Sequence, residues 1–505
     1  MNNKLHIASI VFAATAALSS CNDSYPGLNY DYGGDKITNN ETYDKTPLKV
    51  FVNEQNFFSV SATRGGNDQM GDGLGPLDVS NYEKPIFHVF SFRAKPYSQP
   101  VELKGDVDFT HTLWKADGKY NEDYDLRDCL LDGWNYDFGM PVRLTRDMSG
   151  GFDVIKQLED DEVGLVPEIP EETKDREYFY SAKYQNAGYN FFAYHIDNLY
   201  HTDHTNDITP HREAAAIWYD IKIDGTQDIM CGSAPDLTRN DIKEKYKLEL
   251  TKQEIDEILN AGGYSTIAAH RGVYPIVDMK HMFSQLKFEA VPGDEECNRI
   301  TITGIEVIAP DRGVLTVVSR EKDKIGYKAV GDNASLWLKE ATKKITDPES
   351  GKVLGYESSP LDKEKYKLVW DENCYDETGK VKDLFNRPVT PIGGSIMLPP
   401  QDSYEIRLHF DQELKQTTDG STKTQPLVAK YYIKSPTAGD DGNPLFKSGY
   451  VYTIHIAVYG LQEIKMAASI EGWKEDEGGV DVNPDDPEYD NNPDDPYDDD
   501  NLFAE

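Results

Sequence analysis

In the stretch AIWYDIKIDG, residues 216–225, one set of apolar side chains alternates with a second set made of Trp218, Asp220, Lys222 and Asp224. The apolar side chains recur at every second position, at Ile217, Tyr219, Ile221 and Ile223. A period of two is typical of a β-strand with one buried and one solvated face. The stretch therefore predicts an antiparallel sheet.

The same alternation recurs along much of the chain. It is found in PIFHVFSF (85–92), YNFFAYHI (189–196), HMFSQLKFEA (281–290), RITITGIEVI (299–308), SYEIRLHF (403–410) and YVYTIHIAVYG (450–460). Near the N-terminus, residues 48–52 and 57–62 predict a first strand. Gly304 interrupts one run and predicts a β-bulge. Many strands at short spacing favour β-sandwiches and exclude a doubly wound fold.

The period changes between residues 236 and 272, where a short helix is predicted. Thr251 and Glu254 have the spacing of a capping box, and Leu250 and Ile255 that of a hydrophobic staple. Gly262 stands where the helix would end. A second helix is expected around SLWLKEATKKI, residues 335–345.

These patterns predict an all-β chain of two antiparallel sandwiches, over residues 48–235 and 273–474, with a helical insertion over 236–272. Residues 475–505 contain acidic residues and prolines, with no lysine or arginine, and include NPDDPEYD (483–490) and NPDDPYDD (492–499). Proline and like charges oppose both helix and sheet, so a disordered acidic tail is expected.

The composition restricts the partners. The chain has 505 residues with 89 acidic and 52 basic side chains, a net charge of −37. A field of this sign repels polyphosphates, so nucleic acid is not an expected partner. The chain is nevertheless 38% hydrophobic and rich in tyrosine, as folded β-proteins are.

The first twenty residues have the features of a signal peptide. Lys4 precedes an apolar run, Ile7 to Leu18, that is too short to span a bilayer. The run ends in Leu18-Ser19-Ser20-Cys21, which looks like a lipobox. We therefore expect removal of residues 1–20, lipidation of Cys21, a tether over 21–47 and attachment to a bacterial membrane. The alternative is an ordinary signal peptide followed by a chance cysteine.

The usual local motifs of hydrolases and nucleotide-binding enzymes are missing, since HExxH, GxSxG, Walker and GxGxxG motifs do not occur. We expect no enzyme, no cofactor and no catalytic residue.

The remaining cysteines, with no CxxC pair, are expected to be buried or to form at most one or two bridges; they are Cys129, Cys231, Cys297 and Cys374. Two loops carry residue types that bind metals. One contains His195, His201, His204 and His211, and the other contains Asp117, Asn121, Asp123, Asp125 and Asp128. Neither matches the spacing of a known metal site, so solvated loops are favoured over metal sites.

In this order, several motifs resemble the fimbrillin family, the lipoprotein-derived subunits of type V pili. They are SATRGG (61–66), YNFFAYHID (189–197), QDIMCGSA (227–234), DMKHMFSQLKFEA (278–290), GSIMLPPQDSYEIRLHF (394–410), FKSGYVYTIHIAVYG (446–460) and IKMAASIEGW (464–473). The resemblance implies two transthyretin-like Greek-key sandwiches. It also implies that the lipidated precursor reaches the outer membrane and the cell surface. There, the resemblance implies, a trypsin-like protease cuts after an arginine or lysine and releases the first strand, and a strand of the next subunit replaces it.

Arg64 is the expected processing point. It follows the predicted first strand, and Gly65 and Gly66 give the flexible backbone that a protease cleft requires. The alternative is a turn with a solvated arginine, since Lys49 and Arg93 are also cleavable in principle.

The C-terminus departs from the pattern of a stalk subunit. Beyond Trp473 the chain offers no apolar, alternating strand that could be donated. We therefore expect a subunit at the tip of a pilus, which accepts a strand and presents loops to a host or bacterial surface ligand. The alternative function is a non-polymerising, glycan-binding surface lipoprotein, and a weaker one is an outer-membrane hydrolase.

Overall fold

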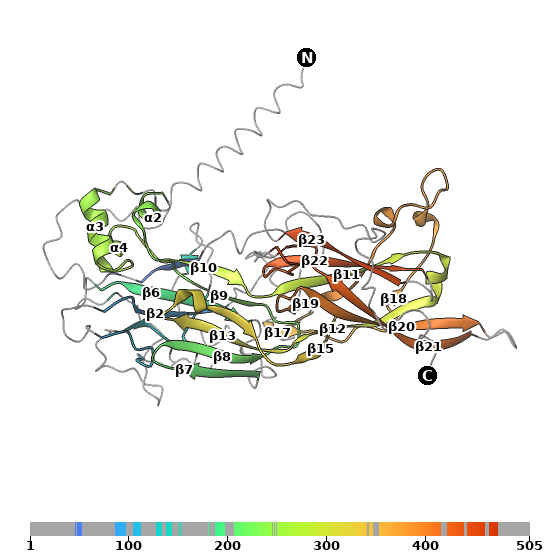
Figure 1. Ribbon diagram of the computed structural model, residues 1–505, viewed down its shortest axis with the longest axis horizontal. Coiled ribbons are helices and arrows are strands. Elements are labelled where there is room, and N and C mark those ends of the chain that lie inside the picture. The colour runs from blue at the N-terminus through green and yellow to red at the C-terminus, as the bar shows by residue number, and fades with distance from the viewer. Residues whose placement is uncertain are drawn as a thin grey trace, which may run out of the picture.

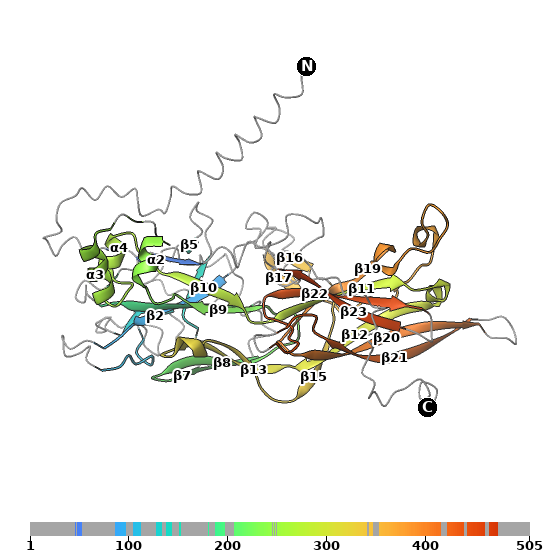
Figure 2. The same ribbon diagram turned by 45° about the horizontal axis from the view of Figure 1, so that its top comes forward.

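The computed structural model describes residues 46, 48–52, 86–96, 105–112, 128–133, 138–143, 151–152, 180, 187–196, 207–244, 246, 248, 250–340, 343–346, 353–415, 422–438, 442–459 and 464–472. These residues form mostly strands with few helices, so the predicted all-β class is confirmed. They are arranged in two lobes that lie end to end (Figures 1 and 2). The Greek-key connectivity stays a prediction.

The larger sheet of the N-terminal lobe has the described order β3-β2-β6-β9-β10-β1-β5, with β4 paired to β2. Its strands are β1 (Val50–Val52), β2 (Ile86–Arg93), β3 (Cys129–Leu131), β4 (Met140–Arg143), β5 (Gly151–Phe152), β6 (Tyr189–Ile196), β9 (Ile229–Ser233) and β10 (Ile276–His281). Neighbours are antiparallel except β1 and β10, which are parallel.

The second sheet of this lobe has the order β14-β13-β8-β7. Its strands are β7 (Ile208–Arg212), β8 (Ala216–Lys222), β13 (Arg312–Ser319) and β14 (Gly326–Ala329). Ile217, Tyr219 and Ile221 of β8 are buried, as the alternation predicts. The Tyr194 hydroxyl of β6 donates to the Tyr219 hydroxyl at 3.1 Å, so the two sheets face each other.

The C-terminal lobe pairs the sheet β19-β11-β22-β23 with the sheet β15-β12-β20-β21, in which β18 also pairs with β12. Its strands are β11 (Ser284–Pro292), β12 (Ile300–Pro310), β15 (Asn333–Trp337), β18 (Tyr366–Lys367), β19 (Thr390–Leu398), β20 (Ser403–Lys415), β21 (Thr422–Lys434), β22 (Tyr450–Val458) and β23 (Ile464–Gly472), and β16 (Lys343–Thr346) and β17 (Val353–Glu357) form a separate hairpin. Strands β11 and β22 are parallel. The ring of Phe446 lies 4.7 Å from the rings of both Tyr404 and Tyr452, between the two sheets.

The bulge predicted at Gly304 is confirmed, because the register between β12 and β20 shifts between Ile302 and Gly304. The predicted helix at 335–345 is wrong. Leu336 and Leu338 are buried while Trp337 between them is 46% exposed. This period of two places residues 333–337 in a strand.

Helices α2 (Arg239–Glu244), α3 (Lys252–Asn260) and α4 (Thr266–His270) lie at the end of the N-terminal lobe that is remote from the other lobe (Figures 1 and 2). The predicted capping box of Thr251 and Glu254 is present at the start of α3. Short 3₁₀ helices are η7 (Glu295–Arg299), η8 (Lys322–Lys324), η9 (Glu372–Cys374) and η10 (Leu384–Asn386). None of the helices in the described part of the chain has the length and apolar character needed to cross a membrane.

The lobes share the chain in an interleaved way. Strand β10 joins the sheet of β9, and β13 and β14 join the sheet of β8, although all three come from residues after 273. Leu315 and Val318 of β13 are fully buried there. The segment expected as a C-terminal sandwich, residues 273–474, therefore contributes strands to both lobes.

Candidate functional site: strand β1 and its surroundings

Strand β1 lies inside a sheet although it belongs to the most N-terminal described segment. Phe51 and Val52 pair with Ile276 and Val277 of β10, and Val50 pairs with Phe152 of β5. The Phe51 amide donates to the Pro275 carbonyl at 2.8 Å. The strand therefore fills a gap between two others, and its loss would expose backbone groups of β10.

The side chains of this segment anchor it in the core. Leu48 and Val50 are fully buried and Phe51 is 5% exposed. The Phe51 ring lies 5.8 Å from the Tyr274 ring, and the Lys49 ammonium lies over that same ring at 5.7 Å. Burying three such apolar side chains stabilises the fold by about 5–9 kcal/mol in total. This is comparable with the whole free energy of unfolding of many domains, about 5–15 kcal/mol.

Thr46, two positions before Leu48, is held by polar contacts. Thr46 is buried, and its carbonyl accepts a hydrogen bond from the Tyr180 amide at 3.0 Å. Its hydroxyl lies 2.6 Å from Nε2 of His270 in α4. Burial and the neighbouring Arg271 charge hold the pKa of His270 below its usual value, which favours the neutral imidazole. The helical segment thus helps to fix the entry to β1.

The predicted lipidation and processing residues, Cys21 and Arg64, lie outside the described residues, as do the signal peptide, the tail and the tether predicted over 21–47 except for Thr46. Arg93, the other arginine considered for cleavage, is 1% exposed. Its guanidinium donates to Asp128 at 2.8 Å and to the Lys95 carbonyl at 2.6 Å. In the folded protein, Arg93 is therefore closed to a protease.

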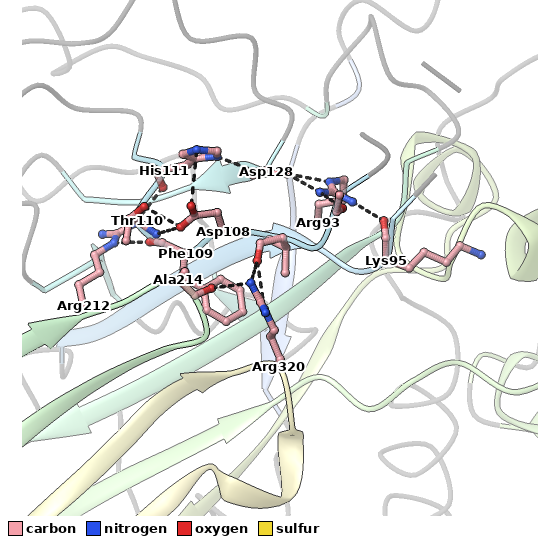
Figure 3. Close-up of polar contacts among 12 residues, drawn as sticks. Arg93, Lys95, Asp108, Phe109, Thr110, His111, Asp128, Arg212, Ala214 and Arg320 are labelled. Carbon is pink, nitrogen blue, oxygen red and sulfur yellow. Dashed lines mark hydrogen bonds and ion pairs between the residues drawn. The ribbon is translucent and has the colours of Figure 1, made fainter. Parts of the chain in front are cut away.

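Three arginines hold the segment 105–112 by its backbone, as Figure 3 shows. Arg93 donates to the Gly105 carbonyl at 2.9 Å, Arg320 to Val107 at 2.6 Å and Arg212 to Phe109 at 2.5 Å. Each guanidinium comes from a different part of the chain. The segment is therefore fixed without pairing in a sheet.

Two of these arginines are also paired with buried carboxylates. Arg212 and Asp132 form an ion pair of 2.7 Å, with both side chains at most 5% exposed. Burial raises the pKa of Asp132, although the Arg212 charge opposes the rise. Asp128 joins Arg93 to His111, whose Nδ1 lies 2.7 Å from the second carboxylate oxygen. Nothing in the sequence indicated this network of arginines, carboxylates and backbone carbonyls, because its partners lie up to 213 residues apart.

The residues considered as metal ligands are dispersed where the structure describes them. His195 is buried in the core, and His211 lies on a sheet face, with Nε2 2.8 Å from Asp220. Asp128 is occupied by Arg93, and His201, His204 and residues 117–125 lie outside the description. Among the described residues, no group of three or more histidine, cysteine, aspartate or glutamate side chains is placed to hold a metal.

The described cysteines are buried free thiols. They are Cys129, Cys231, Cys297 and Cys374. Burial raises the pKa of Cys231 and that of Cys297 to about 12. Since the thiolate is the reactive form, these two side chains are structural at neutral pH.

No family model matches the chain, and no curated protein matches it. Among solved structures, it is similar to a candidate cell adhesion protein of Bacteroides uniformis, with 7% identity over 85% of this chain and 97% of that one, at a TM-score of 0.34. It is also similar to the fimbrial anchor protein Mfa2 of Porphyromonas gingivalis, with 8% identity over 84% and 96% of the two chains, at a TM-score of 0.25. The tip fimbrial protein Mfa3 of the same organism, with a C-terminal truncation, has 14% identity over 49% and 80%, at a TM-score of 0.17.

Proposed function

We propose that this protein is a fimbrillin-like pilus subunit that matures by loss of its first strand. The observation that carries the proposal is the position of β1, a short N-terminal strand that fills the interior of a sheet between β10 and β5. Cleavage after Arg64 would separate β1 from every later strand, because β2 begins at Ile86.

Removal of β1 would create a site for strand addition. The vacated slot would combine the backbone groups of β10 with the apolar pockets that now hold Leu48, Val50 and Phe51. An extended segment of another subunit can satisfy both, since main-chain hydrogen bonds supply affinity and alternate side chains supply specificity. A replacement strand would also recover the burial energy lost with β1.

The proposal places the subunit at the tip of the fibre. Beyond Trp473 the sequence is acidic and rich in proline, which is unsuited to filling an apolar slot in a neighbour. The subunit would accept a strand without donating one. Before cleavage, lipid on Cys21 would hold it at the outer membrane. The proposal includes no enzymatic activity, cofactor or metal.

The N-terminus of the mature surface protein tests this function. Sequencing of protein released from cells or recovered with fibres should begin at Gly65. Arg64→Ala should leave the lipoprotein on the membrane and out of fibres. Lys49→Ala is the matched control, because it removes a nearby basic residue and should leave processing unchanged.

A mature form that still begins at Cys21 inside a fibre would contradict the scheme. A form that begins at Cys21 and is never found with fibres would favour the alternative, a non-polymerising surface lipoprotein.

A further inference from the structure

The outer face of the sheet β15-β12-β20-β21 carries two exposed aromatic side chains, Trp337 on β15 and Tyr432 on β21. They are 46% and 43% exposed. Between them, Glu306 of β12 is paired in register with Trp337 on one side and with Arg407 of β20 on the other. The strand order separates β15 from β21 by three strand spacings, about 14 Å, and Tyr432 lies two residues along β21 from Lys430, the residue in register with Arg407.

The bulge at Gly304 gives the indole its position. A Cβ atom on Gly304 would lie 3.0 Å from Cζ3 of Trp337, so the ring lies across a glycine with no side chain to lift it. The His409 ring lies 4.7 Å from the indole, tilted by 41°. The aromatic surface is therefore held in place before any ligand arrives, which reduces the entropic cost of binding.

A buried carboxylate lies beside this ring. Glu306 is 5% exposed, and it accepts hydrogen bonds from the Ser335 hydroxyl and, at 3.3 Å, from Nη1 of Arg407. Nε2 of His409 lies 3.3 Å from its other oxygen. The carboxylate, the guanidinium and the imidazole thus form one connected network.

A second carboxylate extends the network toward Tyr432. Glu405 accepts from Nε of Arg407 at 2.6 Å and from the Tyr432 hydroxyl at 3.1 Å. Burial opposes ionisation of Glu405, but these hydrogen bonds outweigh it and hold its pKa below the usual value. Lys430 lies 4.0 Å away, so the carboxylates Glu306 and Glu405 are balanced by Arg407 and Lys430. These four side chains together carry no net charge, on a chain of net charge −37.

We propose that this face binds a neutral glycan. A pyranose ring has an apolar C–H side that fits the negative face of an indole, and hydroxyl groups that donate and accept at once. Such hydroxyl groups can form hydrogen bonds with a carboxylate–guanidinium network without breaking an ion pair in it. A charged ligand would have to displace one partner and leave the other without its counter-charge, which is costly. The span from Trp337 to Tyr432 admits more than one sugar ring.

The test is a glycan array of neutral, sialylated and sulfated oligosaccharides, probed with the purified, uncleaved protein. We expect binding to neutral glycans and a loss of at least about tenfold in affinity for Trp337→Ala. Trp218→Ala is the matched control, because this tryptophan lies on a sheet face of the other lobe and is covered by the stacked His211 ring at 5.2 Å. The control should bind as the wild type does.

Trp337→Tyr keeps a ring at the same position and should retain more binding than Trp337→Ala, which separates ring stacking from a loss of folding. Absence of binding to every glycan, binding only to the acidic glycans, or equal binding by Trp337→Ala and the wild type would each overturn the proposal. Because the uncleaved chain is used, the result does not depend on processing at Arg64.

Discussion

Replacing Leu48 by alanine should destabilise the N-terminal lobe far more than replacing its neighbour Lys49. Leu48 is fully buried just before β1, so its truncation removes apolar burial and leaves a cavity. The expected cost is about 2–5 kcal/mol of unfolding free energy. The Lys49 side chain is only partly buried, and its contact with the Tyr274 ring is worth about 1 kcal/mol or less.

Urea unfolding followed by tryptophan fluorescence measures the difference. With a slope of about 1–3 kcal/mol per molar urea, Leu48→Ala should move the midpoint down by roughly 0.7–5 M, and Lys49→Ala by a few tenths of that shift. Equal midpoints for the two variants would show that the segment before β1 is not an anchor. The energetic basis for strand replacement would then be lost.

Other changes test separate parts of the structure. Asp132→Asn should cost about 3–5 kcal/mol in urea unfolding, because it removes the carboxylate charge from the buried ion pair with Arg212; an unchanged midpoint would contradict the network. Burial and the charge of His195 lower the pKa of His88 to about 3, whereas the unfolded imidazole titrates near 6.5. The unfolded chain therefore binds the extra proton between these values, and stability should fall as the pH drops from about 6.5 toward 3. His88→Asn should flatten the dependence of the unfolding free energy on pH between pH 7 and 5, and an unaltered slope would show that other groups cause this dependence. Cys21→Ala should take up no radiolabelled palmitate, and labelling of the variant would refute the lipobox.

The strands were predictable where one face is buried and the other is solvated. Strand β8 shows this alternation in its sequence and in its burial. Strand β11 alternates in its sequence but not throughout its burial, because Ser284, Gln285 and Leu286 are all buried; the Gln285 amide donates to the Ser395 hydroxyl at 2.8 Å inside the protein. Trp337 was assigned to a helix because helix formers follow it in the sequence, although Leu336 and Leu338 already have strand spacing.

The site was predictable only in its local part. Alternation near the N-terminus indicated that Leu48 and Val50 face a core, and the structure confirms their burial. The parallel pairing of Phe51 with Ile276 could not be foreseen, because it joins residues more than two hundred positions apart. The pairing of β13 with β8 could not be foreseen either, because the local sequence indicates which face of a strand is buried and not which strand lies beside it.

Strand replacement in trans tests the central claim most directly. The protein is cleaved after Arg64, the released N-terminal fragment is washed out in mild urea, and a synthetic peptide of residues 46–52, TPLKVFV, is added. We predict that loss of the fragment lowers the melting temperature and exposes the amides of β10 to hydrogen exchange, and that the peptide restores both, whereas the same peptide carrying Val50→Asp restores neither. A cleaved protein that keeps its full stability without the fragment, or one that never takes up the peptide, would contradict the account.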